Sequence, residues 1–253
     1  MAETRDDLIA DAAANLAGWH DSSLRALGLE CERDAALWRA SMPGPSVYFC
    51  AVTLGSGERT DDHLEGIEEL AGTHPSVPLT VCDSFNALDL APLGFERLRT
   101  GTWMVRKPAD PQRRPFPADL VIERVITPGQ LAEWEAASAM GFGSPAPTPG
   151  SLHGAGILSD ARMQVFAGKV DGKVVAGSMG YLTERVNGVY GVSTIPGYRR
   201  RGYAEWLTWR AILGRPHQPA ILQPGEESEP LYHRMGFEPM GQYTAWHRGP
   251  AEG

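Results

Sequence analysis

The sequence has few cysteines, no long apolar run and no basic leader. Its three cysteines, Cys31, Cys50 and Cys82, form no CxxC pair and no cluster with histidine. We therefore expect reduced, mostly buried thiols and no metal site. No apolar segment approaches the roughly 20 residues that cross a membrane, and the first residues are acidic where a signal peptide is basic. These features predict a soluble, cytoplasmic protein that does not contact a membrane.

A surplus of positive charge is also missing. Acidic residues outnumber basic ones by 31 to 23, which gives a formal net charge of −8. The electrostatic term of binding to nucleic acid would be repulsive, so we expect no nucleic-acid partner even though the chain contains a run of arginines. The hydrophobic fraction of 42% is ordinary for a globular protein and argues against disorder.

A proline-rich segment divides the 253 residues. Residues 107–117, KPADPQRRPFP, contain four prolines and little apolar content. Proline fixes φ and removes a backbone donor, so such a stretch favours a stiff, extended connection. We expect a linker over 107–117, one domain over 1–106 and a second over 118–248.

Periodicity and turn residues predict the elements of both domains. Helices are expected at 7–17, 61–72, 130–140, 202–213 and 230–235, and strands at 46–54, 78–83, 102–106, 119–126, 163–170, 173–182, 188–193, 220–222 and 243–248. The dipeptide Asp171-Gly172 predicts a two-residue hairpin turn.

One short motif occurs twice. Residues 93–96 (LGFE) precede Trp103 and Arg106, and residues 235–238 (MGFE) precede Trp246 and Arg248. The distance from Phe to Trp is eight residues in the first copy and nine in the second. The repeat predicts two related domains in tandem, each ending in the same helix, turn and strand.

The segment 193–204, STIPGYRRRGYA, carries the strongest chemical signal. It connects a predicted strand to a predicted helix, whose first backbone N–H groups have no partner within the helix. These donors, the helix dipole and the arginines together favour an anion, and Gly202 lets the backbone approach a phosphate closely. The segment matches neither GxxxxGK[ST] nor GxGxxG. Taken alone, it is equally typical of a solvated basic helix start.

Two spaced motifs resemble those of the GNAT (GCN5-related N-acetyltransferase) superfamily. Arg199-x-x-Gly202-x-Ala204 is similar to its cofactor motif [QR]-x-x-G-x-[GA], and residues 231–237, LYHRMGF, are similar to LYxxxGF. The resemblance covers about half of the chain. It implies an α/β (α+β) fold in which a mixed, mostly antiparallel, twisted sheet is flanked by helices, here in two tandem related domains. It also implies transfer of an acetyl group from acetyl-CoA, as co-substrate, to an amine of a small molecule or peptide.

The resemblance also implies roles for individual residues. The backbone at the strand end would hold the pantetheine arm, the arginine loop would hold the pyrophosphate, Tyr232 would protonate the departing CoA thiolate, and Ser228 would contact the cofactor. Relatives often have asparagine where this chain has Gly225, so that contact would be lost or supplied by Gln223. The cofactor residues implied in the strand and loop are Val192, Ser193, Thr194, Arg199, Arg200, Arg201, Gly202, Tyr203 and Ala204.

The sequence leaves several points open. The general base could be Glu123, Glu184, Glu226 or His153, or a carboxylate that acts through water. The loop 141–156, with Phe142 and His153, is a hypothesis for the acceptor wall. A non-catalytic acyl-CoA-binding or sensor module is the alternative function. The first domain lacks the arginine loop, so we expect it to be structural or to help build the acceptor pocket. The oligomeric state, including a homodimer, is not decided by the sequence.

Overall fold

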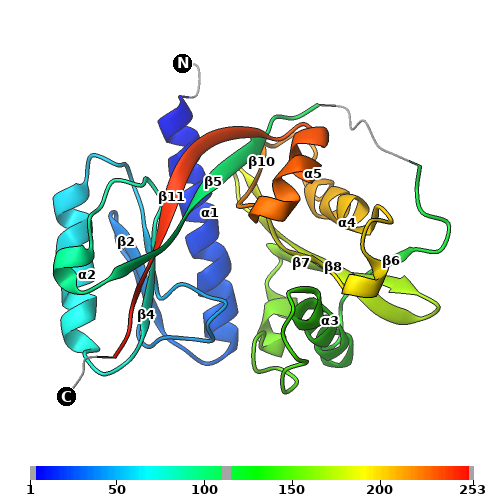
Figure 1. The fold of residues 1–253 in the computed structure, drawn as a ribbon, viewed down its shortest axis with the longest axis horizontal. Coiled ribbons are helices and arrows are strands. Elements are labelled where there is room, and N and C mark those ends of the chain that lie inside the picture. Colours follow the sequence, from blue (N-terminus) through cyan, green and yellow to red (C-terminus); the bar gives the residue numbers. More distant parts are fainter. Residues whose placement is uncertain (1–3, 110–114, 251–253) are drawn as a thin grey trace. The chain divides into compact units, whose positions relative to one another are not determined.

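The computed structural model describes residues 4–109 and 115–250, in two compact units (Figure 1). The first unit contains the chain up to Met104, Gln223–Gly225 and the residues from Pro239 onward; the second contains Val105–Leu222 and Glu226–Glu238. Of the expected linker, 107–109 and 115–117 form no helix or strand, and 110–114 lie outside the described residues. The grouping differs from the expected domains at the C-terminal strand, which we had assigned to the second domain.

The first unit is a sheet with a helix on each side (Figure 1). Helix α1 (Arg5–Ala26) begins with a capping box, in which the Thr4 hydroxyl accepts the Asp7 N–H and the Asp7 carboxylate accepts the Thr4 N–H. Helix α2 spans Thr60–Thr73. The strands, in spatial order, are β1 (Cys31–Arg33), β2 (Leu37–Ala40), β3 (Ala51–Thr53), β4 (Leu79–Asp83), β11 (Glu238–Arg248) and β5 (Glu96–Arg106).

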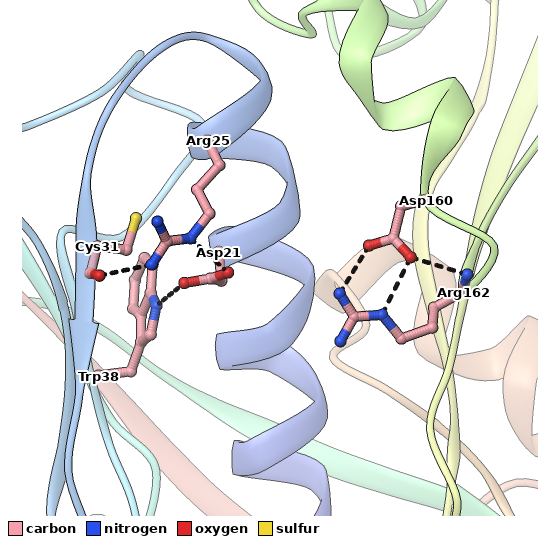
Figure 2. A network of polar contacts seen from close by, with 6 residues as sticks. All are labelled: Asp21, Arg25, Cys31, Trp38, Asp160 and Arg162. Atoms are coloured by element: carbon pink, nitrogen blue, oxygen red, sulfur yellow. Dashed lines mark hydrogen bonds and ion pairs between the residues drawn. The ribbon is translucent and has the colours of Figure 1, made fainter.

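A polar network joins α1 to the first two strands (Figure 2). The Asp21 carboxylate accepts hydrogen bonds from Arg25 Nε (2.9 Å) and from the Trp38 indole N–H (3.1 Å). Arg25 also donates to the Cys31 carbonyl, at 2.6 Å. Because the Trp38 side chain is buried, its indole N–H requires such an acceptor.

The last strand of the chain lies in this first unit. β11 pairs antiparallel with β4, from Thr244 opposite Asp83 to Arg248 opposite Leu79. Trp246 is part of the apolar core between α2 and the sheet. The Arg248 guanidinium lies 5.4 Å from the Phe95 ring centroid and donates to carbonyls at the end of α2.

The second unit is a sheet between helix α3 (Pro128–Gly141) on one face and α4 (Tyr203–Ile212) on the other (Figure 1). Gly177 leaves room for the Trp134 ring of α3, and the hydroxyl of the next residue, Ser178, donates to the Leu207 carbonyl of α4 at 2.9 Å. Consecutive strand residues thus contact opposite helices, as the pleat requires. The strands, in spatial order, are β10 (Ala220–Leu222), β9 (Asn187–Thr194), β8 (Lys173–Leu182), β7 (Met163–Val170) and β6 (Val121–Arg124).

Short helices complete the two units. Helix α5 spans Glu229–Arg234, and single 3-10 turns are η1 (Ala91–Leu93), η2 (Ala155–Ser159), η3 (Pro196–Tyr198) and η4 (Glu226–Ser228). The Gly residues of the repeated motif, Gly94 and Gly236, both have φ above +80° or equal to it, at 80° and 84°. Each ends a helical turn in the left-handed conformation that glycine adopts without strain.

The expected fold class is confirmed. Most described strand pairs are antiparallel, whereas β3 with β4 and β9 with β10 are parallel. The hairpin at Asp171-Gly172 joins β7 to β8 as expected. The strand expected at 46–54 is wrong in its first half, because Tyr48 N–H donates to the Pro45 carbonyl in a turn and β3 begins only at Ala51. Strands β1 and β2 were not predicted.

Three further properties can be read from the described part of the chain. None of its helices combines the length and the apolar character needed to cross a membrane. It holds no group of three or more His, Cys, Asp or Glu side chains arranged to bind a metal ion. Cys31, Cys50 and Cys82 are buried, and none is bonded to another.

His20 is buried in an aromatic environment within the first unit. The centroid of its ring lies 4.9 Å from that of Trp19, 5.5 Å from Phe49 and 5.6 Å from Trp38. Nδ1 is 2.9 Å from the Leu16 carbonyl, so the neutral ring donates there. Burial lowers the pKa of His20 from 6.5 to about 4. His153 of the second unit has the same shift for the same reason.

We predict that acid destabilises the protein through His20. Between pH 6.5 and about 4 the unfolded chain binds a proton that folded His20 does not, so its contribution to the free energy of unfolding falls by about 1.4 kcal/mol per pH unit. Urea unfolding from pH 7 to 4.5 should show a shallower decline for His20→Phe than for the unchanged protein. The exposed His217→Gln serves as control; equal slopes for His20→Phe and the unchanged protein would contradict the prediction.

Candidate functional site

The candidate site begins where β9 loses one of its two neighbours. β10 pairs with β9 only at Asn187 and Gly188, so in the described ladder the segment Val189–Thr194 has no partner on that side. On the other side β8 continues to pair as far as Thr194, with an irregular register between Gly177 and Met179. The unpaired edge of β9 exposes backbone groups to which an extended ligand can hydrogen-bond.

The loop after β9 directs backbone N–H groups to one place. Arg200 and Gly202 adopt left-handed conformations, with φ of 64° and 86°. Gly202 is the N-cap of α4 and has no side-chain cap. Among the described residues no hydrogen bond takes up the N–H of Gly202, Tyr203 or Ala204, because the helical pattern starts with Trp206 N–H donating to Gly202. These groups and the helix dipole form a site suited to phosphate.

Two of the three arginine side chains are engaged by the protein itself. Arg199 donates from Nε to the Thr194 carbonyl (3.2 Å) and from Nη2 to the Gly141 carbonyl (2.9 Å). Arg201 lies 3.7 Å from the Asp119 carboxylate. Arg200 is exposed. The sequence predicted that the arginines would add countercharge and planar donors for the phosphate; the structure uses the side chains of Arg199 and Arg201 to shape the loop.

Tyr203 fixes the first turn of α4 from below. Its side chain is buried, and its hydroxyl donates to the Asp119 carboxylate at 2.5 Å. Burial raises the pKa of Tyr203, and the hydrogen bond to Asp119 adds to the shift. Asp119 was not identified from the sequence. It holds both Arg201 and Tyr203, so the conformation of the loop depends on it.

The end of β9 contributes side chains of three kinds. Val192 is half-buried, and the buried Ser193 donates to Ser138 of α3 at 3.3 Å. The Thr194 hydroxyl is buried and has no hydrogen-bond partner among the described residues. A buried hydroxyl without a partner costs free energy, and a polar ligand group at the strand end would remove that cost.

Tyr232 lies on α5 and is buried, with 5% of its surface exposed. Its ring centroid is 5.7 Å from that of Phe237, in an edge-to-face arrangement. Burial raises the pKa of Tyr232 to about 12, against the opposing effect of a hydrogen bond with Thr208 of α4. The phenol is therefore protonated at neutral pH. Ser228 is the N-cap residue of α5.

The four candidate bases have different environments. Glu123 is exposed and forms an ion pair with Lys169 at 2.7 Å. His153 is buried edge-to-face against Trp134, and burial lowers its pKa to about 4, which makes it a weak base. Glu184 is exposed in the β8–β9 loop, and Glu226 is exposed in η4. Gln223 donates to Cys82 of the first unit, at 4.0 Å.

Glu135 is a residue that the sequence analysis missed. It is 1% exposed, and its carboxylate accepts the N–H groups of Gly150 (2.7 Å), Leu152 (2.7 Å) and His153 (2.8 Å). It thereby anchors the Gly- and Pro-rich loop that follows α3. A signal was available, because Glu135 lies one helical turn after the buried Leu131 and thus on the buried face.

The same loop is fixed again where it enters β7. Arg162 donates to Asp160 from Nη2 (2.8 Å), from Nε (3.0 Å) and from its backbone N–H (2.9 Å) (Figure 2). The guanidinium of Arg162 lies 5.2 Å from the Tyr181 ring centroid. Polar contacts thus secure the loop in its middle and at its end, whereas Phe142 at its start is 64% exposed.

Comparison with known proteins supports the fold. No protein-family model and no curated protein matches the chain. Among solved structures, the chain is similar to a GCN5-related N-acetyltransferase from Kribbella flavida, with a TM-score of 0.61, 19% identity and coverage of 94% of this chain and 96% of that chain. It is also similar to a GNAT-family structure from Novosphingobium aromaticivorans, with a TM-score of 0.60, 18% identity and coverage of 95% and 97%.

A third structure, a GCN5-related N-acetyltransferase from Sphaerobacter thermophilus, has a TM-score of 0.53 at 17% identity and covers 76% of this chain and 67% of that chain. The chain therefore has the fold of the GNAT N-acetyltransferases. The resemblance found in the sequence is confirmed at the level of the fold.

We predict that Gly202→Val weakens CoA binding by about tenfold or more, because a side chain would enter the space through which a diphosphate approaches the amides. A Cβ at Gly202 would meet only Pro117 Cγ, at 3.9 Å, so the protein itself leaves the space open. Isothermal titration with CoA measures the effect. Gly172→Val is the matched control, since Gly172 has φ of 76° and no atom within 4 Å of its Cβ position. Equal affinities for the Gly202→Val variant and this control would contradict the assignment.

Proposed function

We propose that the protein is an acyltransferase that moves an acetyl group from acetyl-CoA to an amine of a small molecule or peptide. The observation that carries the proposal is the convergence of the N–H groups of Gly202, Tyr203 and Ala204 beside the unpaired edge of β9. A diphosphate fits the first feature, and the amides of a pantetheine arm fit the second. The unpartnered Thr194 hydroxyl at the strand end supports the same ligand.

Acetyl-CoA would supply an acetyl group activated as a thioester. The backbone of Val192–Thr194 would align the pantetheine, and the amides from Arg199 to Ala204 would hold the diphosphate, with Ser228 as a further contact. The amine nitrogen would attack the thioester carbonyl directly, so that a C–N bond forms as the C–S bond breaks. The amine must be neutral for this attack, which requires a base; the contacts of Glu123, Glu184, Glu226 and His153 do not select one of them.

Tyr232 is the proposed general acid. Its hydroxyl holds a proton at neutral pH because burial raises its pKa to about 12. A phenol positioned by a helix can pass that proton to the leaving sulfur while the C–S bond breaks, and it is restored from solvent. The packing of Tyr232 against Phe237 keeps its ring in one orientation.

The second candidate function is acyl-CoA binding without catalysis. It is favoured by Gly225, which provides no side chain where relatives often have asparagine, and by the hydrogen bond that already engages the Tyr232 hydroxyl with Thr208. Measurement of CoA-thiol release over a panel of amines, including polyamines, amino acids and peptide N-termini, separates the two. Tight acetyl-CoA binding without turnover of any amine would favour the binding module.

We also propose that the two units are related copies in tandem. Both contain two adjacent parallel strands joined by a helix, β3–α2–β4 and β9–α4–β10, followed by a helical turn, a left-handed glycine and a long strand. Phe95 and Phe237 are both buried after these glycines. The first copy would contribute stability, or a wall of the acceptor pocket, rather than cofactor binding.

We predict that Tyr232→Phe lowers turnover by about 100-fold, because the proton donor to the leaving thiolate is lost. Acetyl-CoA affinity should stay within about twofold, since the ring and its packing remain. Tyr181→Phe removes a hydroxyl from another buried tyrosine of the second unit and is the control. Turnover by Tyr232→Phe equal to that of the control would rule out the acid role.

A further inference from the structure

Arg199 makes contacts that a phosphate ligand does not need. Its Nε and Nη2 groups donate to two carbonyls from different elements, Thr194 at the end of β9 and Gly141 at the end of α3. The planar guanidinium can reach both because its donors point in fixed, separate directions. We call this pair of hydrogen bonds the Arg199 bridge.

The Gly141 carbonyl needs this donor. It belongs to the last turn of α3, where carbonyl groups lack partners within the helix. The neighbouring carbonyls of Ser138, Ala139 and Met140 are taken by the N–H groups of 142–144, but the only described donor to Gly141 is Arg199. The last turn of α3 contains no basic residue, so Arg199 also supplies the positive charge that stabilises a helix C-terminus.

The end of α3 and the end of β9 are in tight contact at this place. A Cβ on Gly141 would come within 2.8 Å of Ser193 Cβ and 3.1 Å of the Thr194 nitrogen. Ser193 and Ser138 are hydrogen-bonded at 3.3 Å. A shift of α3 would therefore move the strand end, and a shift of the strand end would move α3.

Helix α3 also holds the loop that follows it. Glu135, on the same helix, accepts three N–H groups from residues 150–153. One helix is thus hydrogen-bonded both to the loop of free amides, through Arg199, and to the loop 141–156, through Glu135. Neither contact requires a ligand.

We propose that Arg199 is a positioning residue, whose side chain joins the C-terminus of α3 to the anion-binding loop and so fixes the direction of the amides of Gly202–Ala204. This inference rests on the proposed function for the identity of the anion, but not for the bridge itself. Lysine keeps the charge at this position but cannot donate to both carbonyls in the same fork.

The experiment compares Arg199→Lys and Arg199→Gln with the unchanged protein. Without the bridge the last turn of α3 should fray, so the amides of Phe142, Gly143 and Ser144 should exchange about fivefold faster in both variants, which corresponds to a loss of about 1 kcal/mol of hydrogen bonding. Hydrogen exchange followed by NMR without ligand measures this. Arg215→Lys, at the opposite end of α4, is the control with the same chemical change.

CoA binding by calorimetry at several salt concentrations is the second measurement. Both Arg199 variants should weaken CoA binding by about the same factor of five, and the dependence of affinity on salt should match that of the unchanged protein, because the bridge adds no charge contact to phosphate. Affinity retained in Arg199→Lys but lost in Arg199→Gln, with a weaker salt dependence, would show a direct phosphate ligand and overturn the proposal.

The two measurements separate this inference from the proposed function. If the unchanged protein does not bind CoA, the proposed function fails, and the exchange of Phe142–Ser144 still decides whether the bridge holds α3. Unchanged exchange in Arg199→Lys and Arg199→Gln would overturn the bridge even if CoA binds to the unchanged protein as expected.

Discussion

The two units depend on an exchange of C-terminal strand residues between the two sequence halves. β11, from the second half, pairs with β4 and places Arg248 against Phe95 and beside Gly94 in the first unit. Arg106, from the end of β5, donates to the Met235 carbonyl and lies beside Gly236 in the second unit. Each left-handed glycine turn is thus covered by the arginine of the other copy of the motif. We infer that neither half of the chain could complete its core alone, since an unpaired β4 would leave a central strand with an open edge.

The candidate site depends on side chains that hold the loop so that its amides stay free. Arg199 fixes the start of the loop to carbonyls, while Asp119 fixes its end through Arg201 and Tyr203. A loop that used its own N–H groups in turns would need fewer side-chain contacts but would offer nothing to an anion. Preorganised donors bind without the cost of ordering them, which is the physical advantage of this arrangement.

The sequence predicted those features that local chemistry decides. The hairpin at Asp171-Gly172 follows from the two turn residues, and the start of α4 follows from glycine beside a basic loop. The partner of β11 could not be predicted, because its pairing with β4 joins residues about 160 positions apart and the repeat suggested pairing within each half. The bridge from Arg199 to Gly141 is non-local in the same way. The short strands β1 and β2 carry too few residues for a periodic pattern, and a buried Glu135 contradicts the usual exposure of glutamate.

The start of α2 shows why a helix N-terminus after a parallel strand is not enough to bind a diphosphate. Its first turn contains Asp61 and Asp62, whose charges already interact favourably with the helix dipole and would repel a phosphate. Arg59 is not free to offset them, because it donates to Asp62 at 2.8 Å and to the Ala35 carbonyl at 3.0 Å. A Cβ on Gly57 of the preceding loop would meet Phe85 at 3.2 Å, so the approach is also narrow. The first turn of α4 instead contains a single acid, Glu205, which is 6% exposed. The difference in charge and access between these two helix starts is the reason to assign cofactor binding to the second unit and not to the first.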